Sequence, residues 1–186
     1  MVFIHVGQNN MKSVDIFVQN YFSLSRTAGF TEWMYILSNI FDVTIYSTII
    51  FLCFVLLVYL LKGKKYSIFF TTTIVFTGVS VYFLKIFFDV ARPLDGVMSV
   101  YGQSFPSYHA TMSTVFFIIL IYIFDDYFSS FIRWVFNFLC VFMIFAISFS
   151  RIYLGVHWVS DVVSGIVLGG IISYIAIEVF KKPKLL

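Results

Sequence analysis

The chain has 186 residues, of which 61% are hydrophobic, 22% are aromatic and only 11% are charged, and its mean hydropathy is +0.98. Soluble domains carry about 25% charged residues, so this composition excludes a soluble protein and indicates an integral membrane protein. The net charge of +3 is too small to indicate a nucleic-acid partner. The length fits one all-α polytopic bundle of about five transmembrane helices of ~20 residues each.

Residues 1–42 differ from the rest of the chain because polar residues interrupt the aromatic and aliphatic ones throughout. From Ser13 to Asp42 no window is apolar enough for a clear span. The pattern predicts one or two amphipathic helices lying in the membrane interface, with a break at Gly29 between Thr27 and Thr31. An extra short span hidden in residues 13–42 is the alternative.

Five apolar runs follow, and each is long enough to cross a membrane. The predicted spans are residues 43–61, 66–88, 107–124, 131–149 and 157–180. The chain therefore divides into an N-terminal interfacial segment (1–42), a membrane core (43–180) and a basic tail (181–186).

The lysines predict the orientation of the core. The basic turn 62–65 and the basic tail are separated by four spans, so they lie on the same side of the membrane. Basic segments favour the cytoplasmic side, which places the 89–106 loop and the 150–161 stretch on the extracytoplasmic side.

Three groups of polar residues lie at the ends of spans. Charged side chains are costly at the edge of a membrane, so their presence there indicates a function. The first is Lys85 with Arg92-Pro93, the second is Pro106-Ser107-Tyr108-His109, and the third lies within Ser150–Asp161. The predicted topology brings all three groups to one layer near the outer surface.

The residue types in this layer suit a phosphate. The cations Lys85, Arg92 and Arg151 would repel one another unless an anion sits among them. Ser107 is placed as the N-cap of the third span, so the N–H groups of Tyr108 and His109 would point toward the same anion.

The histidines suit phosphoryl transfer. Asp161 follows His157 by four residues, so in a helix the carboxylate can hold one imidazole nitrogen. Phosphoryl transfer needs charge stabilisation, a nucleophile and an acid for the leaving group, and two histidines can supply the last two. No spacing typical of a metal site occurs.

The combined pattern K-x6-R-P, P-S-x-H and S-R-x5-H-x3-D resembles the signature of the type-2 phosphatidic acid phosphatase superfamily, which includes membrane lipid phosphatases and vanadium haloperoxidases. The resemblance covers about residues 40–180. It implies that His157 is a nucleophile forming a phosphohistidine, that Asp161 orients it and that His109 protonates the leaving oxygen. It implies no metal and no cofactor. The residues that would bind the phosphoryl oxygens are Lys85, Arg92, Ser107, Tyr108 through its N–H, and Arg151.

Two departures accompany the resemblance. Tyr108 stands where the family commonly has glycine, so its ring would shape the entrance to the site. Many bacterial relatives have six spans, and with five predicted spans we expect this chain to lack the first of them. The segment 1–42 would instead cap the opening for lipids or mediate contacts in a homodimer.

We therefore expect a bacterial plasma-membrane lipid phosphatase with an extracytoplasmic site and a lipid phosphate as substrate. Undecaprenyl diphosphate, phosphatidylglycerophosphate and phosphatidic acid are the candidates. A lipid phosphotransferase using the same phosphohistidine is one alternative. A non-catalytic bundle that binds anionic lipid is the other. A haloperoxidase is disfavoured because the chain is small and embedded in the membrane.

Overall fold

The computed structural model describes residues 2–42 and 44–182, and for residues 2–11 only the backbone. This part of the chain is helical and contains no strand, which confirms the all-α fold class. The helices are α1 (Val2–Ser25), α2 (Ala28–Asn39), α3 (Ile45–Lys62), α4 (Lys64–Phe88), α5 (Tyr108–Phe124), α6 (Ser130–Tyr153) and α7 (Val159–Lys181).

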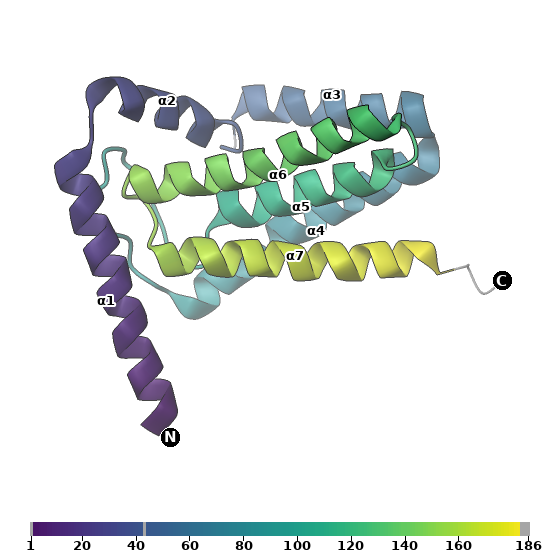
Figure 1. The fold of residues 1–186 in the computed structure, drawn as a ribbon. Helices are drawn as coiled ribbons and strands as arrows, with labels where there is room; N and C mark the ends of the chain where they lie inside the picture. The colour runs from purple at the N-terminus through teal and green to yellow at the C-terminus, as the bar shows by residue number, and fades with distance from the viewer. Residues whose placement is uncertain (1, 43, 183–186) are drawn as a thin grey trace.

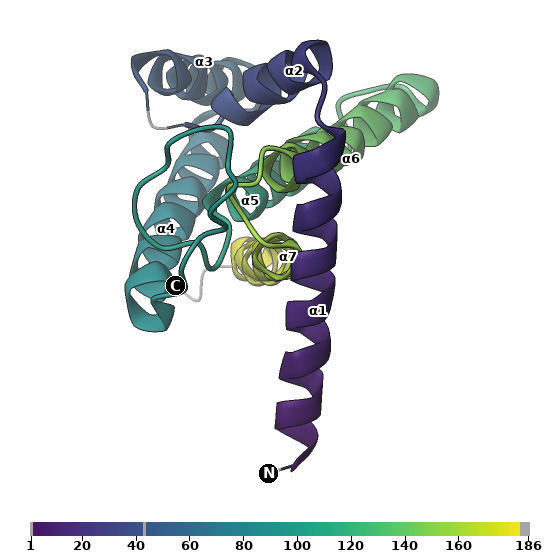
Figure 2. The same cartoon turned by 90° about the vertical axis from the view of Figure 1, so that its left-hand side faces the viewer.

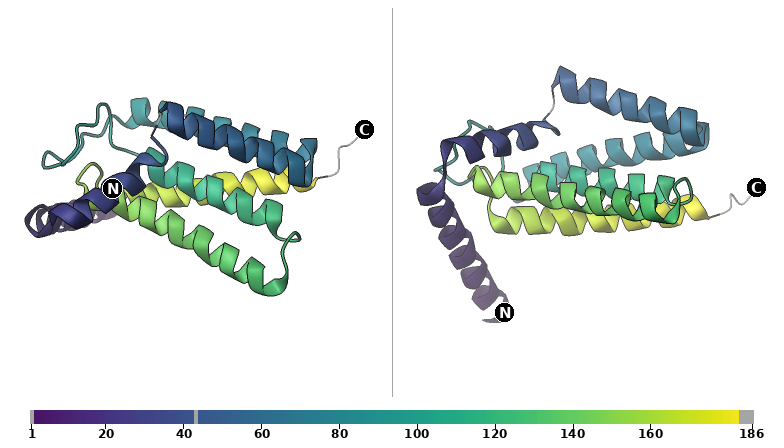
Figure 3. Two further views of the ribbon diagram at one scale, coloured as in Figure 1. Left: turned by 90° about the horizontal axis from the view of Figure 1, so that it is seen from above. Right: turned by 45° about the horizontal axis from the view of Figure 1, so that its top comes forward.

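Helices α3 to α7 form the bundle, with α5 in contact with α4, α6 and α7 (Figures 1 and 3). Among the described residues, α3, α4, α6 and α7 are long and apolar enough to cross a membrane. Helix α5 has 17 residues, or about 25 Å, which is a few ångströms less than a ~30 Å hydrocarbon core. Its burial in the bundle accounts for this, because a helix shielded from lipid need not match the lipid thickness.

Helix α7 packs closely on α5 through two glycines. A Cβ atom at Gly165 would lie 2.9 Å from the carbonyl oxygen of Ser107, and one at Gly169 would lie 2.7 Å from Cβ of Thr114. Small residues let two membrane helices approach at backbone distance. The contact at Gly165 fixes the start of α5 against the first half of α7.

Helix α1 crosses the end of the bundle at a steep angle to the other helices (Figures 1 and 2). Its polar residues Asp15 and Gln19 are buried against the bundle, whereas Phe17, Tyr21 and Leu24 are exposed. A helix across the bundle end with an apolar outer face fits the predicted location in the membrane interface.

Several boundaries differ from the predicted ones. The break between α1 and α2 lies at Arg26 and Thr27 rather than at Gly29, because Thr27 adopts an extended conformation and forms the N-cap of α2. Helix α6 continues to Tyr153, four residues beyond the predicted end, and α7 begins at Val159. Residue 43 and the tail beyond Lys182 lie outside the described residues.

Candidate active site

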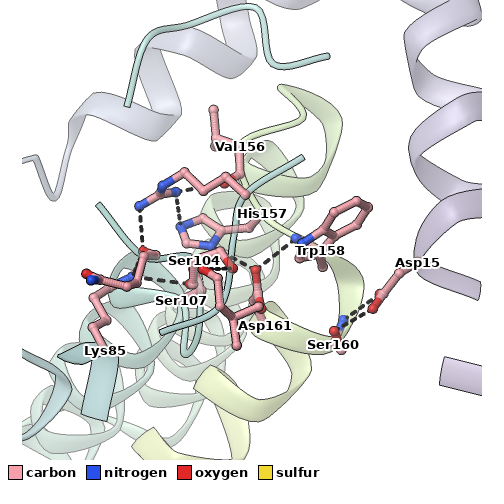
Figure 4. A network of polar contacts seen from close by, with 12 residues as sticks. Asp15, Lys85, Ser104, Ser107, Val156, His157, Trp158, Ser160 and Asp161 are labelled. Atoms are coloured by element: carbon pink, nitrogen blue, oxygen red, sulfur yellow. Dashed lines mark hydrogen bonds and ion pairs between the residues drawn. The ribbon is translucent and has the colours of Figure 1, made fainter. Parts of the chain in front are cut away.

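The three groups of polar residues meet at one end of the bundle. This end contains the last turn of α4, the start of α5, the last turn of α6 and the first turn of α7 (Figure 4). Each predicted site residue is located there. Lys85 ends α4, Arg92 lies in the following loop, Ser107, Tyr108 and His109 open α5, Arg151 ends α6, His157 lies in the α6–α7 connection, and Asp161 lies in the first turn of α7.

His157 is fully buried between an acceptor and a donor. Nδ1 lies 3.2 Å from Oδ2 of Asp161, and Nε2 lies 3.2 Å from Nη1 of Arg92. A carboxylate can only accept a hydrogen bond and a guanidinium can only donate one. The hydrogen of the neutral ring is therefore on Nδ1, and the lone pair of Nε2 points toward Arg92.

The electrostatic surroundings keep this imidazole neutral. Burial, followed by the cations of Arg92, Arg151 and Lys85, holds the pKa of His157 well below its usual range. A neutral ring with its Nε2 lone pair facing a cluster of cations is the form that can attack phosphorus.

Arg92 is held by backbone carbonyls. Its guanidinium donates to the carbonyl oxygens of Gly102 (3.0 Å), Gln103 (3.0 Å) and Val156 (2.7 Å). These three bonds come from two different loops, so they fix the position of the planar group beside His157. Lysine could not reproduce this arrangement, because its ammonium lacks the fork geometry.

Lys85 shares the same loop. Its Nζ donates to the carbonyl oxygens of Gln103 (2.7 Å) and Ser104 (3.2 Å). Ser104 is itself buried and donates from Oγ to the carbonyls of Val90 and Ala91. Residues 102–104 therefore position both cations of the first group.

Arg151 is buried in the last turn of α6, and its Nη1 donates to the hydroxyl of Ser38 in α2. Ser38 is fully buried as well. The N-terminal segment thus supplies a direct partner to one of the cations. The sequence did not indicate Ser38 as a site residue. A serine in an amphipathic helix does not reveal which distant side chain it contacts in the fold.

His109 has a carboxylate neighbour that the sequence did not indicate. Nε2 of His109 lies 2.8 Å from Oδ1 of Asp42, without the alignment of a hydrogen bond. His109 and, more weakly, Arg151 lower the pKa of Asp42, so this carboxylate remains charged at neutral pH. In the sequence Asp42 is the last residue of the predicted N-terminal segment. Its position beside His109 becomes visible only in the folded chain.

Several buried polar atoms of the site have no hydrogen-bond partner among the described residues. They are Oγ of Ser107, Nε2 of His109, Nε of Arg151 and Oδ1 of Asp161. Ser107 is the N-cap of α5, as expected, yet its hydroxyl makes no capping bond. Buried polar atoms are nearly always paired in proteins. Unpaired atoms that gather from the second and third sequence motifs therefore indicate a site built for a polar ligand. The hydroxyl and the Nε–H are donors that suit phosphoryl oxygens.

Asp15 of α1 and Arg26, just after α1, hold the two ends of the connection that carries His157. Asp15 accepts hydrogen bonds from N (2.9 Å) and Oγ (2.6 Å) of Ser160, and so caps the first turn of α7 (Figure 4). Arg26 donates from Nε to the carbonyl of Tyr153 (2.8 Å). Gly155 has a φ of +70°, and a Cβ there would collide with the side chains of Arg26 and Gln19. The positive φ favours glycine at this junction.

An apolar cavity of about 270 Å³ adjoins the site between α3, α4 and α5. Asp42 and Tyr108 line it, together with aromatic side chains such as Phe51, Phe54 and Phe116. The Tyr108 ring is therefore part of the cavity wall, next to His109. The cavity places an apolar surface directly beside the polar layer.

The comparison with protein families decides the classification. The model of the PAP2 superfamily matches residues 66–184. The chain belongs to the PAP2 superfamily. This confirms the family that the three motifs resemble.

Two solved structures are similar to this one in fold. The transmembrane PAP2-type phosphatidylglycerolphosphate phosphatase from Bacillus subtilis aligns with a TM-score of 0.86 and 19% identity, covering 96% of this chain and 90% of that one. LpxE from Aquifex aeolicus aligns with a TM-score of 0.71 and 19% identity, covering 88% and 94%. A search of curated proteins found no match. At this identity the two structures establish the fold, and the chain is an integral membrane protein of that fold.

Proposed function

We propose that this PAP2 protein is a lipid phosphatase that removes a terminal phosphate from a lipid phosphomonoester or diphosphate through a phosphohistidine. The observation that carries the proposal is the state of His157. Its Nδ1 is held by Asp161 and its neutral Nε2 faces Arg92, within a layer that also holds Lys85 and Arg151.

In the first step Nε2 of His157 attacks phosphorus, a P–N bond forms, and the bond to the leaving oxygen breaks. The imidazole becomes cationic, and the Asp161 carboxylate at Nδ1 stabilises that charge. The cations Arg92, Arg151 and Lys85, with the Ser107 hydroxyl, stabilise the charge on the equatorial oxygens.

In our proposal the leaving oxygen takes its proton from His109. The charged Asp42 carboxylate beside the ring favours the protonated form that an acid requires. In the second step water attacks phosphorus, a P–O bond forms and the P–N bond to His157 breaks. His109 accepts a proton from that water, His157 returns to the neutral imidazole with its Nε2 lone pair, and inorganic phosphate leaves. His109 thus acts as acid in one half-reaction and base in the other.

The apolar cavity beside Tyr108 supports a lipid as substrate. Its aromatic lining would accept the first part of a hydrocarbon tail while the phosphate occupies the polar layer. Undecaprenyl diphosphate, phosphatidylglycerophosphate and phosphatidic acid all combine these two parts. We further propose that the site faces the extracytoplasmic side of a bacterial plasma membrane, from the distribution of lysines.

Phosphate release in detergent micelles tests the function. The three lipids are supplied singly with water as the sole acceptor, with and without EDTA, and His157→Ala is the control. We expect phosphate from at least one lipid, unchanged by EDTA and abolished by His157→Ala. Activity that survives His157→Ala would contradict the mechanism, and loss of activity with EDTA would contradict its independence of metal.

The same experiment separates the alternatives. A lipid phosphotransferase would release no phosphate until an acceptor lipid or sugar is added. A non-catalytic bundle would release none under any condition. Trapping with radiolabelled substrate should give an acid-labile, alkali-stable phosphoprotein in the native chain and none in His157→Ala.

A further inference from the structure

A second concave surface lies at the opposite end of the bundle, about 30 Å along α4 from Lys85. It is a groove of about 1160 Å³ between the start of α4 and the end of α7. The proposed chemistry uses none of its residues. The lining residues are Lys64, Lys65, Ile68, Phe69, Thr72, Thr73, Phe76, Ile172, Ile175, Ala176, Val179, Phe180, Lys181 and Lys182.

The rim of the groove is basic. Lys64 and Lys65 stand on α4, and Lys181 and Lys182 stand at the end of α7, all exposed. Lys181 is paired with Glu178 at 3.0 Å, and Nζ of Lys65 lies 4.7 Å from the centre of the Phe180 ring. Within the described residues, Lys64, Lys65 and Lys182 have no carboxylate partner. At least one uncompensated charge from each helix therefore flanks the groove.

Below the rim the groove is apolar. The hydroxyls of Thr72 and Thr73 donate to carbonyls of their own helix, those of Ile68 and Phe69, both at 2.8 Å. Both hydroxyls are thus satisfied within α4 and need no polar partner from the groove. From Lys64 to Phe76 the groove follows α4 over twelve residues, or about 18 Å. This length is close to the ~15 Å of hydrocarbon in one leaflet.

We propose that this groove is a binding site for an anionic phospholipid of the leaflet at this end of the bundle. The phosphate of the head group would lie between Lys64 and Lys182, and one acyl chain would follow the apolar floor between α4 and α7. Charge complementarity selects this occupant over a zwitterionic lipid, because basic pockets between membrane helices bind anionic head groups.

Native mass spectrometry of the whole chain in detergent tests the site, because it counts bound lipids and reports the oligomeric state in one spectrum. The probes are dioleoyl phosphatidylglycerol, dioleoyl phosphatidylcholine and inorganic phosphate. We expect one phosphatidylglycerol to bind several-fold more tightly than phosphatidylcholine, and inorganic phosphate not to compete, because the tail contributes to binding.

Lys64→Ala and Lys182→Ala should each weaken phosphatidylglycerol binding about fivefold, the effect of one lysine near an anionic head group. Arg133→Ala is the matched control. It removes one positive charge at the same end of the bundle, where Arg133 pairs with Asp125 outside the groove, and it should leave binding unchanged. Thr72→Phe fills the exposed floor and should weaken binding of both lipids.

Equal binding of the two lipids by the native chain would overturn the proposal, as would equal effects of Lys64→Ala and Arg133→Ala. A dimer that Thr72→Phe dissociates, without any lysine-dependent lipid adduct, would instead assign the groove to a second copy of the chain. Melting temperatures of the variants without added lipid identify any that fails to fold. A variant that fails is replaced by the corresponding glutamine substitution.

Discussion

Asp161→Asn tests the proposed orientation of His157 most directly. Asp161 is buried, and its Oδ2 contacts Nδ1 of His157 at 3.2 Å and accepts from the backbone N–H of Trp158 at 3.0 Å. The amide keeps an acceptor for the Trp158 N–H. It removes the negative charge that would stabilise the imidazolium formed when Nε2 bonds to phosphorus.

The expected loss of rate follows from the hydrogen bond between His157 and Asp161, which the substitution weakens. A hydrogen bond to a charged group contributes about 1.5–3 kcal/mol. Because this charge pair is stronger once the imidazole is cationic, most of that energy acts on the transition state. The rate should fall roughly 10- to 150-fold, at about 1.4 kcal/mol for each factor of ten. The assay is steady-state phosphate release from the most active lipid, with kcat and KM measured separately.

Asp15→Asn is the matched control for this experiment. Asp15 is also a buried carboxylate that accepts from the first turn of α7, through the N–H and hydroxyl of Ser160. It makes no contact with His157. We expect a lower melting temperature and a change in kcat of less than about threefold, since helix caps contribute about 1 kcal/mol to stability. Equal losses of kcat in the two variants would refute the orienting role of Asp161 and leave it as a helix cap only.

Three further outcomes are expected. Asp42→Asn should lower kcat about tenfold, because His109 loses the carboxylate at 2.8 Å that favours its protonated form. A rise in activity would instead show that Asp42 competes with the substrate phosphate. Gly155→Ala should lower the melting temperature by several degrees, because φ is +70° and its Cβ would collide with Arg26. An unchanged melting temperature would contradict the close packing of Arg26 on Gly155. Because the pKa of His157 is lowered in the folded chain, the unfolded chain binds more protons there as the pH falls from about 6.5 toward that lowered pKa. Stability should therefore fall with decreasing pH by up to about 1.4 kcal/mol per unit and stay level above pH 6.5. His157→Gln should remove this part of the slope in thermal unfolding curves.

The sequence predicted the parts of the fold that depend on hydropathy. The apolar runs correspond to α3 through α7, and the residues of the three motifs lie at one end of the bundle. These features follow from the thickness of a membrane and from the cost of charges within it. The boundaries were less accurate, because α6 extends to Tyr153, where Arg151 obtains a buried polar partner from α2. A hydropathy pattern contains no information on such a partner.

The supporting residues of the site could not be predicted. Asp42, Ser38 and Asp15 belong to a segment that looked like an interfacial helix, and each reaches the site only through tertiary packing. Helix α1 illustrates the reason. Its amphipathic pattern indicates one polar and one apolar face, but not that the polar face lies on the protein and the apolar face points outward.

The cations of the site lie close together. Nζ of Lys85 and Nη2 of Arg92 donate to the same carbonyl oxygen, that of Gln103, so the loop holds the two charges side by side. Carbonyls are dipoles and cancel no net charge. The carboxylates of Asp42 and Asp161 offset two of the three cations, so the site with neutral histidines carries one net positive charge. Protonation of His109 would raise this to two, which matches a phosphate dianion. Substrate binding and the acidic state of His109 should therefore reinforce each other, since each supplies the charge that the other requires.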